Sequence, residues 1–234
     1  MSTKKDKFSK KDRYYMDLAL NLARERVGLT GDNPSVGCVI VKNDIIIAIG
    51  QTGIGGRPHA EYNAIKSYNK NFKGSKMYVT LEPCAHYGKT PPCSNIIINS
   101  KIKEVIFPLE DIDKRTSGKS KQTFVSKKIK VRIGLLKKKA KDIYKPYFYN
   151  RKKKLPFVTG KLAVSKDKFI SSINKIRITN SDSDNFSQLL RYKNDAILIS
   201  SKTLNKDNPK LNCRLHGLEN FSPKRVIIDR NLLI

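Results

Sequence analysis

Two short segments of the chain together contain a histidine, a glutamate and two cysteines, residue types that suit a metal centre. The first is Pro58-His59-Ala60-Glu61, and the second runs from Glu82-Pro83-Cys84 to Pro91-Pro92-Cys93. Zinc prefers imidazole and thiolate ligands, and a catalytic zinc site uses three protein ligands and leaves the fourth position for water. We therefore predict that His59, Cys84 and Cys93 bind a catalytic Zn²⁺ ion.

Glu61 remains free for proton transfer, because the three predicted ligands complete the protein's share of the coordination. In zinc deaminases of nucleobases a His-x-Glu segment precedes a Pro-Cys segment, and the glutamate carries a proton from water to the departing ammonia. This chain has the same residue types in the same order. The order favours hydrolytic deamination, with Glu61 as the catalytic residue.

The predicted ligands stand where helices are expected to begin. Pro91 and Pro92 precede Cys93, and proline suits the first turn of a helix. The free amide groups at a helix N-terminus stabilise a thiolate there. His59 opens a segment with apolar residues at helical spacing, namely Ala60, Ala64, Ile65 and Tyr68.

A structural role for these residues is the alternative. A lone histidine or a single pair of cysteines is more often structural than metal-binding. A structural zinc site would have four protein ligands, and His86, between the two cysteines, could supply the fourth. We expect His86 to support a ligand or to face the substrate instead, because the three-ligand set is already complete.

The stretch from Thr80 to Cys93 resembles the deaminase half of the bifunctional deaminase/reductase family of riboflavin biosynthesis. Its cysteines are farther apart than the Cys-x-x-Cys of cytidine and tRNA adenosine deaminases. The segment Asn33-Pro34-Ser35-Val36-Gly37 is similar to the family's Asn-Pro-x-Val-Gly. The resemblance implies a zinc-dependent pyrimidine deaminase domain over residues 1–150, with a cytidine-deaminase-like α/β/α sandwich fold.

The reaction that the resemblance implies is hydrolytic removal of the 2-amino group of 2,5-diamino-6-(5-phosphoribosylamino)pyrimidin-4(3H)-one, which yields 5-amino-6-(5-phosphoribosylamino)uracil. By the same resemblance, Asn33 contacts this phosphorylated small-molecule substrate and Lys89 contacts its phosphate. An asparagine amide can donate and accept hydrogen bonds at a pyrimidine edge, and a lysine provides a point charge. The chain departs from some relatives at Thr52, where they carry a substrate-contacting histidine.

The basic stretch from Arg151 to Pro156 marks a change of character, which we interpret as a domain junction. After it we expect a buried strand over residues 157–165, a helix over 182–193, and strands over 196–200 and 225–229. Strands that alternate with a helix favour a parallel sheet. Residues 151–234 also resemble the reductase half of the same family, which implies a partial dihydrofolate-reductase-like α/β domain that uses NADPH.

The resemblance implies site residues in this second half as well. The expected NADPH contacts are Ala163, Arg177, Thr203 and Asp207. The expected substrate contacts are Lys175, Arg191, Leu211 and Arg214, of which the arginines can bind a phosphate in bidentate geometry. The chain ends at Ile234, with about half of the family's reductase domain present. We therefore expect deaminase activity with little or no reductase activity.

The formal net charge is +28, from 48 Lys and Arg against 20 Asp and Glu. Such a charge attracts nucleic acid and other anions without specificity. The lysines are scattered and accompany abundant isoleucine and asparagine, a bias typical of AT-rich coding sequences, so we do not expect a nucleic-acid partner. A deaminase of RNA or of free nucleosides and a nonenzymatic basic zinc-binding protein remain the alternative hypotheses.

The four cysteines are too few for a disulfide scaffold, which favours a reducing, cytoplasmic compartment. Cys38 lies in the apolar run 36–41 and is expected in the core, whereas Cys213 has no evident role. No apolar run reaches the ~18 residues of a membrane span. Ser9 and Asp12 predict a helix start, followed by the core-facing residues Tyr15, Leu18 and Leu22. The resemblance also implies a homo-oligomer.

Overall fold

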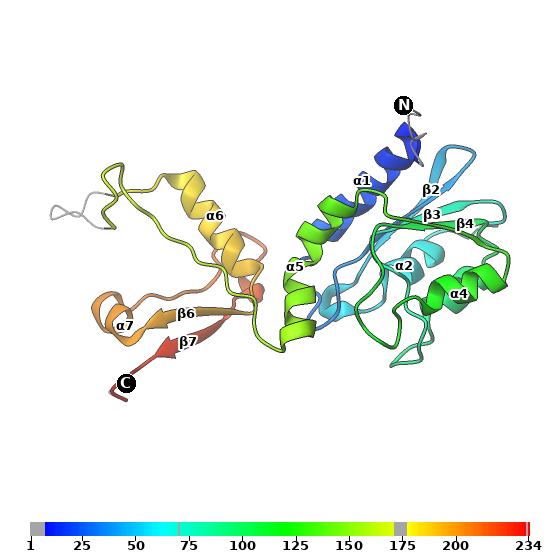
Figure 1. The fold of residues 1–234 in the computed structure, drawn as a ribbon. Helices are drawn as coiled ribbons and strands as arrows, with labels where there is room; N and C mark the ends of the chain where they lie inside the picture. The colour runs from blue at the N-terminus through cyan, green and yellow to red at the C-terminus, as the bar shows by residue number, and fades with distance from the viewer. Residues whose placement is uncertain (1–7, 70, 171–176, 233) are drawn as a thin grey trace, which may run out of the picture. The chain divides into compact units, whose positions relative to one another are not determined.

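The structure is a computed structural model that describes residues 8–69, 71–170, 177–232 and 234. The chain forms two compact units, one that ends at Phe157 and one that begins at Val158 (Figure 1). The division into a deaminase domain over residues 1–150 and a reductase domain over residues 151–234 stays a prediction.

The first unit is built on a five-stranded mixed sheet with the strand order β2-β1-β3-β4-β5. β2, β1 and β3 are antiparallel neighbours, and β3, β4 and β5 run parallel. Parallel neighbours need crossover connections, which here contain α3 and α4. The strands are β1 (Gly37–Lys42), β2 (Ile45–Gln51), β3 (Lys76–Val79), β4 (Glu104–Phe107) and β5 (Lys130–Ile133).

Helices cover both faces of this sheet (Figure 1). α1 packs on β1 and β3 and contacts α5, whereas α2 packs on β1 and β2 and contacts α3, which in turn contacts α4. This α/β arrangement is the class predicted from the sequence. The helices are α1 (Lys10–Glu25), α2 (Ala60–Lys66), α3 (Cys93–Asn99), α4 (Lys119–Ser126) and α5 (Lys137–Lys153), with a short 3-10 helix η1 (Ile54–Gly56).

Two glycines allow the helices to approach the sheet closely. A Cβ atom on Gly37 would lie 2.0 Å from the carbonyl oxygen of Ala19 in α1, and one on Gly50 would lie 2.3 Å from that of Ala60 in α2. Cys38 is the strand partner of Gly50, and successive residues of a strand face opposite sides. α1 and α2 therefore lie on opposite faces, and the contact at Gly50 fixes the start of α2.

α1 begins as predicted, at a capping box. Ser9 Oγ accepts a hydrogen bond from Asp12 N at 3.0 Å, and Asp12 Oδ2 accepts one from Ser9 N at 2.9 Å. Tyr15 is buried, and Leu18 and Leu22 pack against the core, which confirms the predicted core-facing side. Cys38 is fully buried in β1, also as predicted.

A buried polar network joins α1 to the sheet. Tyr78 OH in β3 donates to Asp12 Oδ1 at 2.7 Å, and Arg132 Nη2 in β5 donates to the same oxygen at 3.0 Å. Arg132 Nε also donates to Glu104 Oε1 in β4 at 2.6 Å. The Asp12 carboxylate thus caps its own helix and bonds to two strands.

In the second unit, β6 and β7 pair in parallel, with Ala196 opposite Lys224. The predicted helix over 182–193 and the predicted strands over 196–200 and 225–229 are confirmed to within one residue. The elements are α6 (Ser181–Tyr192), β6 (Ala196–Ser200), α7 (Ser201–Asp207), the 3-10 helix η2 (Glu219–Phe221) and β7 (Lys224–Ile228).

The buried strand predicted over residues 157–165 is wrong. The segment has no strand, and the side chains of Val158 and Leu162 are 82% and 74% exposed. The sheet that the described residues form here pairs β6 with β7 alone. The apolar residues motivated the prediction, but a strand needs a hydrogen-bonded neighbour and an apolar surface to cover.

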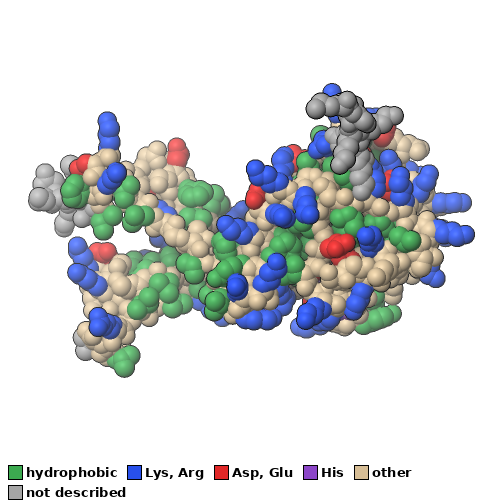
Figure 2. Space-filling model, in the orientation of Figure 1, with side chains coloured by type: hydrophobic (Ala, Val, Ile, Leu, Met, Phe, Trp, Pro, Cys, Tyr) green, Lys and Arg blue, Asp and Glu red, His purple; other side chains and the backbone are tan. Residues whose placement is uncertain are grey.

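No helix in the part of the chain that the structure describes is long and apolar enough to cross a membrane. On the face shown in Figure 2, Lys and Arg side chains are spread among neutral residues and form no single stripe.

Candidate metal centre and active site

The loop before α2 places His59 at the start of the helix. Gly53 N donates to Pro58 O at 2.9 Å and closes the loop. Gly56 has a φ of +90°, and a Cβ atom there would lie 2.4 Å from Asn33 Nδ2, so both backbone and space require glycine. His59 is the N-cap residue of α2, as predicted. Asn33 therefore lies against the loop that leads to His59.

The second segment brings two sulfur atoms together. Cys93 is the first residue of α3, as predicted. Its backbone N donates to Cys84 Sγ at 3.2 Å, and Ser94 N donates to Cys84 O at 3.1 Å. The start of α3 is thus bonded to the turn that carries Cys84.

His59, Cys84 and Cys93 form one cluster. His59 Nδ1 lies 3.6 Å from Cys84 Sγ and 3.3 Å from Cys93 Sγ. Their potential ligand atoms all lie within 4.8 Å of one another, and this is the one such group among the described residues. Around a tetrahedral zinc ion, a nitrogen and a sulfur ligand would be about 3.5 Å apart. The donor set and its spacing therefore fit zinc.

The protonation of the cluster also suits a metal site. The hydrogen bond with Cys93, opposed by burial and supported by His59, lowers the pKa of the Cys84 thiol to about 4. The hydrogen bond with Cys84 raises the pKa of His59, and the same partner together with burial raises the pKa of Cys93. Because a metal ion binds the deprotonated thiolate and the neutral imidazole, metal binding here would be coupled to proton release.

Glu61 lies in the first turn of α2, and only 3% of its surface is exposed. Burial raises the pKa of its carboxyl group to about 7. Cys38 in β1 is close enough that the charge of Glu61, after burial, raises the pKa of that thiol as well. A carboxyl group with a pKa near neutrality can both accept and donate a proton at pH 7.

His86 lies outside the ligand cluster of the described residues. Its Nδ1 is 3.1 Å from Thr116 Oγ1. Lys89 is exposed in the same segment, and Thr90 Oγ1 accepts a hydrogen bond from Arg57 Nη1 at 2.5 Å. The described residues thus offer three candidate ligands, and Arg57 links the loop before His59 to the segment between the two cysteines.

Thr52 has a structural role in this chain. Its side chain is 1% exposed, and its Oγ1 accepts a hydrogen bond from Val36 N at 2.9 Å. Thr52 N in turn donates to Val36 O at 2.9 Å. The hydroxyl group ties the end of β2 to the start of β1.

Sequence reasoning gave no role to Glu82, which the structure shows to be a buried anchor. Glu82 Oε2 accepts hydrogen bonds from Asp111 N at 3.1 Å and Gly118 N at 3.0 Å, and Oε1 accepts one from Ser120 Oγ at 2.8 Å. These bonds hold the loop that carries Thr116. An acidic residue directly before Pro-Cys was a signal, but partners 29 to 38 residues away cannot be found from spacing.

In the second unit, the structure brings Arg191, Leu211 and Arg214 to the same region. Arg191 Nη1 donates to Asn212 O at 3.0 Å, and Arg214 N donates to Gln188 Oε1 at 3.0 Å. Leu211, next to Asn212, is buried. Burial and the charge of Arg214 lower the pKa of Arg191, which indicates two guanidinium groups close to one another.

The predicted NADPH contacts lie on different segments of the second unit. Thr203 and Asp207 both lie on α7. Arg177 forms an ion pair with Asp184 in α6, and Ala163 lies in the irregular segment before it. Lys175 lies outside the described residues.

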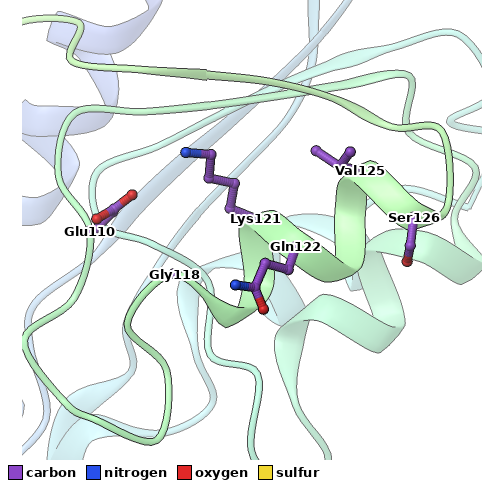
Figure 3. Close-up of a pocket in the computed structure, with 6 residues that line it drawn as sticks. All are labelled: Glu110, Gly118, Lys121, Gln122, Val125 and Ser126. Carbon is purple, nitrogen blue, oxygen red and sulfur yellow. The ribbon is translucent and has the colours of Figure 1, made fainter.

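A surface pocket of about 510 Å³ lies beside α4 (Figure 3). Its lining residues are Glu110, Gly118, Lys121, Gln122, Val125 and Ser126. A large pocket is the usual first candidate for a ligand site. None of the four residues His59, Glu61, Cys84 and Cys93 lines it, so the pocket is separate from the candidate metal centre.

Comparison with known proteins identifies the class. Residues 9–109 match the family described as the cytidine and deoxycytidylate deaminase zinc-binding region, and residues 156–234 match the RibD C-terminal domain. With the mixed sheet and its covering helices, these matches define a cytidine-deaminase-like α/β fold followed by a RibD-type, dihydrofolate-reductase-like α/β domain. The fold class predicted from the sequence is confirmed.

Comparison with individual proteins is more specific than the match to the two family models. The chain is 36% identical to the riboflavin biosynthesis protein RibD of Aquifex aeolicus, over 94% of this chain and 62% of the relative. It is 34% identical to RibD of Escherichia coli, over 93% of this chain and 63% of the relative. The chain is thus similar to RibD proteins over most of its own length, and it spans less than two thirds of the length of these relatives.

Two solved structures are also similar to this chain over most of its length. A diaminohydroxyphosphoribosylaminopyrimidine deaminase/5-amino-6-(5-phosphoribosylamino)uracil reductase from Thermotoga maritima superposes with a TM-score of 0.87 at 36% identity, covering 94% of this chain and 64% of that one. Acinetobacter baumannii RibD superposes with a TM-score of 0.85 at 34% identity, covering 96% of this chain and 65% of that one.

Proposed function

We propose that the first unit catalyses the hydrolytic deamination of 2,5-diamino-6-(5-phosphoribosylamino)pyrimidin-4(3H)-one to 5-amino-6-(5-phosphoribosylamino)uracil in riboflavin biosynthesis. The observation that carries this proposal is the cluster of His59, Cys84 and Cys93 with the buried Glu61 in the first turn of the adjoining helix. The RibD relatives support the choice of substrate.

His59, Cys84 and Cys93 would hold the zinc ion. When bound, zinc would supply Lewis acidity that makes a water molecule a stronger nucleophile at neutral pH. Three ligands, rather than the four of a structural site, favour catalysis over a purely structural role. The low pKa of Cys84 means that this ligand needs no deprotonation at neutral pH.

Glu61 would move the protons of the reaction. Its carboxylate accepts a proton from the water that attacks C2 and passes it to the ring nitrogen beside C2. It then takes the proton of the new C2 hydroxyl group and gives it to the 2-amino nitrogen, which leaves as ammonia as the C2–N bond breaks. The pyrimidine gains a C2 carbonyl group, and Glu61 returns to its starting state.

Asn33 and Lys89 are the proposed substrate contacts in this unit. Asn33 lies against Gly56, which belongs to the loop that precedes His59. This position supports a role for Asn33 beside the metal centre. Lys89 is exposed and lies between the two cysteines in the chain. The amide would bond to the pyrimidine edge, and the lysine would attract the phosphate.

For the second unit we propose a share in the family's reductase site. Arg191 and Arg214 carry like charges close together, and a substrate phosphate beside Leu211 would relieve their repulsion. Lys175, outside the described residues, stays a proposed substrate contact on the resemblance alone. Ala163, Arg177, Thr203 and Asp207 are the proposed NADPH contacts. β7 is exposed along its described length, so the described residues leave this strand largely uncovered, and we expect NADPH oxidation to be slow.

The test is to follow ammonia release, product mass and NADPH absorbance together in the zinc-loaded protein supplied with the diaminopyrimidine ribosyl phosphate. We expect ammonia and a product heavier than the substrate by the exchange of an NH group for oxygen, with little loss of NADPH. Release of no ammonia would refute the deaminase proposal. NADPH oxidation at the rate of deamination would refute the expectation for the second unit.

The relatives do not favour the alternatives of an RNA or nucleoside deaminase and of a nonenzymatic basic zinc-binding protein. Location in the cytoplasm and assembly into a homo-oligomer stay predictions.

A further inference from the structure

Arg57 lies two residues before His59 and is half-buried, and the structure gives contacts for both of its terminal nitrogens. Its Nη1 donates to Thr90 Oγ1 at 2.5 Å, a bond that links the two segments of the metal centre. Its Nη2 lies 3.7 Å from the position that a Cβ atom on Gly88 would occupy. The bond to Thr90 fixes one side of the guanidinium plane and leaves Nη2 directed toward Gly88.

His86 approaches the same position from another side. Its Nε2 lies 4.0 Å from the Cβ position of Gly88. The other ring nitrogen, Nδ1, is bonded to Thr116, which orients the ring and leaves Nε2 available. Gly88 has no side chain, so the space between Arg57 Nη2 and His86 Nε2 is not filled by residue 88.

Arg57 also has no carboxylate partner among the salt bridges of the described residues. Lys89, the residue after Gly88, adds a second positive charge to the same segment. A half-buried guanidinium group without a carboxylate partner is suited to an anionic ligand, and a planar fork held in place binds phosphate with little loss of freedom.

We propose that Arg57 is a specificity-determining residue that binds the phosphate group of the substrate, with Arg57 Nη2 and His86 Nε2 on either side of the open position beside Gly88. This inference rests on the proposed deaminase function, and it goes further because it assigns the preference for a phosphorylated substrate to Arg57. Lys89 then contributes long-range attraction, while Arg57 provides the directed hydrogen bonds.

The test compares kcat and KM of the full-length, zinc-loaded chain for the phosphorylated substrate and for the same compound without its phosphate. Arg57→Gln should raise KM for the phosphorylated substrate about tenfold or more, change kcat less than about threefold, and leave KM for the dephosphorylated compound unchanged. Arg57→Lys should give a KM for the phosphorylated substrate between those of the wild type and Arg57→Gln, because a lysine keeps the charge without the planar fork.

Two further variants separate binding from folding. Gly88→Ala should fold normally, since its nearest contacts would be at van der Waals distance, yet raise KM for the phosphorylated substrate by narrowing the space. Arg24→Gln removes the same charge from α1, where Arg24 bonds to Asn21, and should leave both KM values unchanged. Equal effects of Arg57→Gln on both substrates, or an unchanged KM, would overturn the proposal.

A binding measurement distinguishes this inference from the deaminase proposal. Inorganic phosphate should bind the wild-type chain and the Arg24→Gln variant, with affinity at least about tenfold weaker in Arg57→Gln, by titration calorimetry at constant ionic strength. If wild type releases no ammonia but shows this pattern, the deaminase proposal fails and the anion site stands. If wild type deaminates and Arg57→Gln binds phosphate normally, the anion site alone is refuted.

Discussion

At the scale of single residues, the two cysteines of the cluster differ although both are candidate ligands. Cys84 accepts hydrogen bonds and has a lowered pKa, whereas the pKa of Cys93 is raised. Cys84 therefore loses its thiol proton more readily than Cys93 does. Sequence reasoning found both residues from their neighbours, but their inequality depends on contacts between segments far apart in the chain.

The Cys84→Ser variant should lose bound zinc, because serine replaces the one ligand that is already ionised. We expect less than about one tenth of the wild-type zinc content after gel filtration, with lower thermal stability, since a ligand bound only by the folded state stabilises it. Metal analysis and thermal unfolding measure the two effects. The matched control is Cys213→Ser, a buried cysteine of the second unit, which should keep its zinc. Wild-type zinc content in Cys84→Ser would show that the cluster is not the metal site.

At the scale of elements, the capping residue of α1 also ties that helix to the sheet. Burial alone would raise the pKa of Asp12, but hydrogen bonds from Arg132 and Tyr78 outweigh burial and hold it well below its ordinary value. A carboxyl group with a depressed pKa in the folded state stabilises the fold above its unfolded pKa of about 3.9. This contribution is lost as the pH falls below that value.

The free energy of unfolding should therefore decrease between about pH 5 and pH 3. Asp12→Asn should cost about 3 kcal/mol at pH 7, because it leaves Arg132 buried with Glu104 as its remaining carboxylate partner, and should flatten the pH dependence. Urea unfolding at several pH values measures both effects. The control is Asp17→Asn, whose exposed pair with Lys139 should be worth less than about 1 kcal/mol. An unchanged pH slope in Asp12→Asn would contradict this account.

Local signals predicted the element starts well and the long-range connections poorly. The Ser9-Asp12 cap, the Pro-Cys93 helix start and the helical spacing after His59 each lie within a few residues, so the sequence contains them in full. Residues 157–165 have the apolar composition of a strand, but strand formation depends on a neighbour elsewhere in the fold. The Glu82 anchor could not be predicted for the same reason.

At the scale of the whole molecule, the net charge of +28 should affect substrate capture more than chemistry. A strongly positive protein attracts an anionic substrate, and salt screens this attraction. We expect kcat/KM for the phosphorylated substrate to fall about threefold or more between ~0.02 M and ~0.3 M salt. The dephosphorylated compound is the control and should show no such change. Equal salt dependence for both would mean that salt acts on the protein itself.

Sequence reasoning located the change of character near residues 151–156, and the structure separates its two compact units between Phe157 and Val158. The functional assignment of the two halves came from resemblance in motifs such as Thr203 to Arg214. Composition and periodicity could indicate only an α/β class for the second unit, because they do not show where α6 and α7 lie relative to the parallel strands β6 and β7.

The most direct test of the central claim is to measure bound zinc and ammonia release on the same preparations of wild type, Glu61→Ala and Glu61→Gln. If the cluster holds the metal and Glu61 moves the protons, all three should bind about one zinc ion per chain. Ammonia release should fall about 100-fold or more in both variants. Full activity in either variant, or loss of zinc in both, would contradict the separation of metal binding from proton transfer.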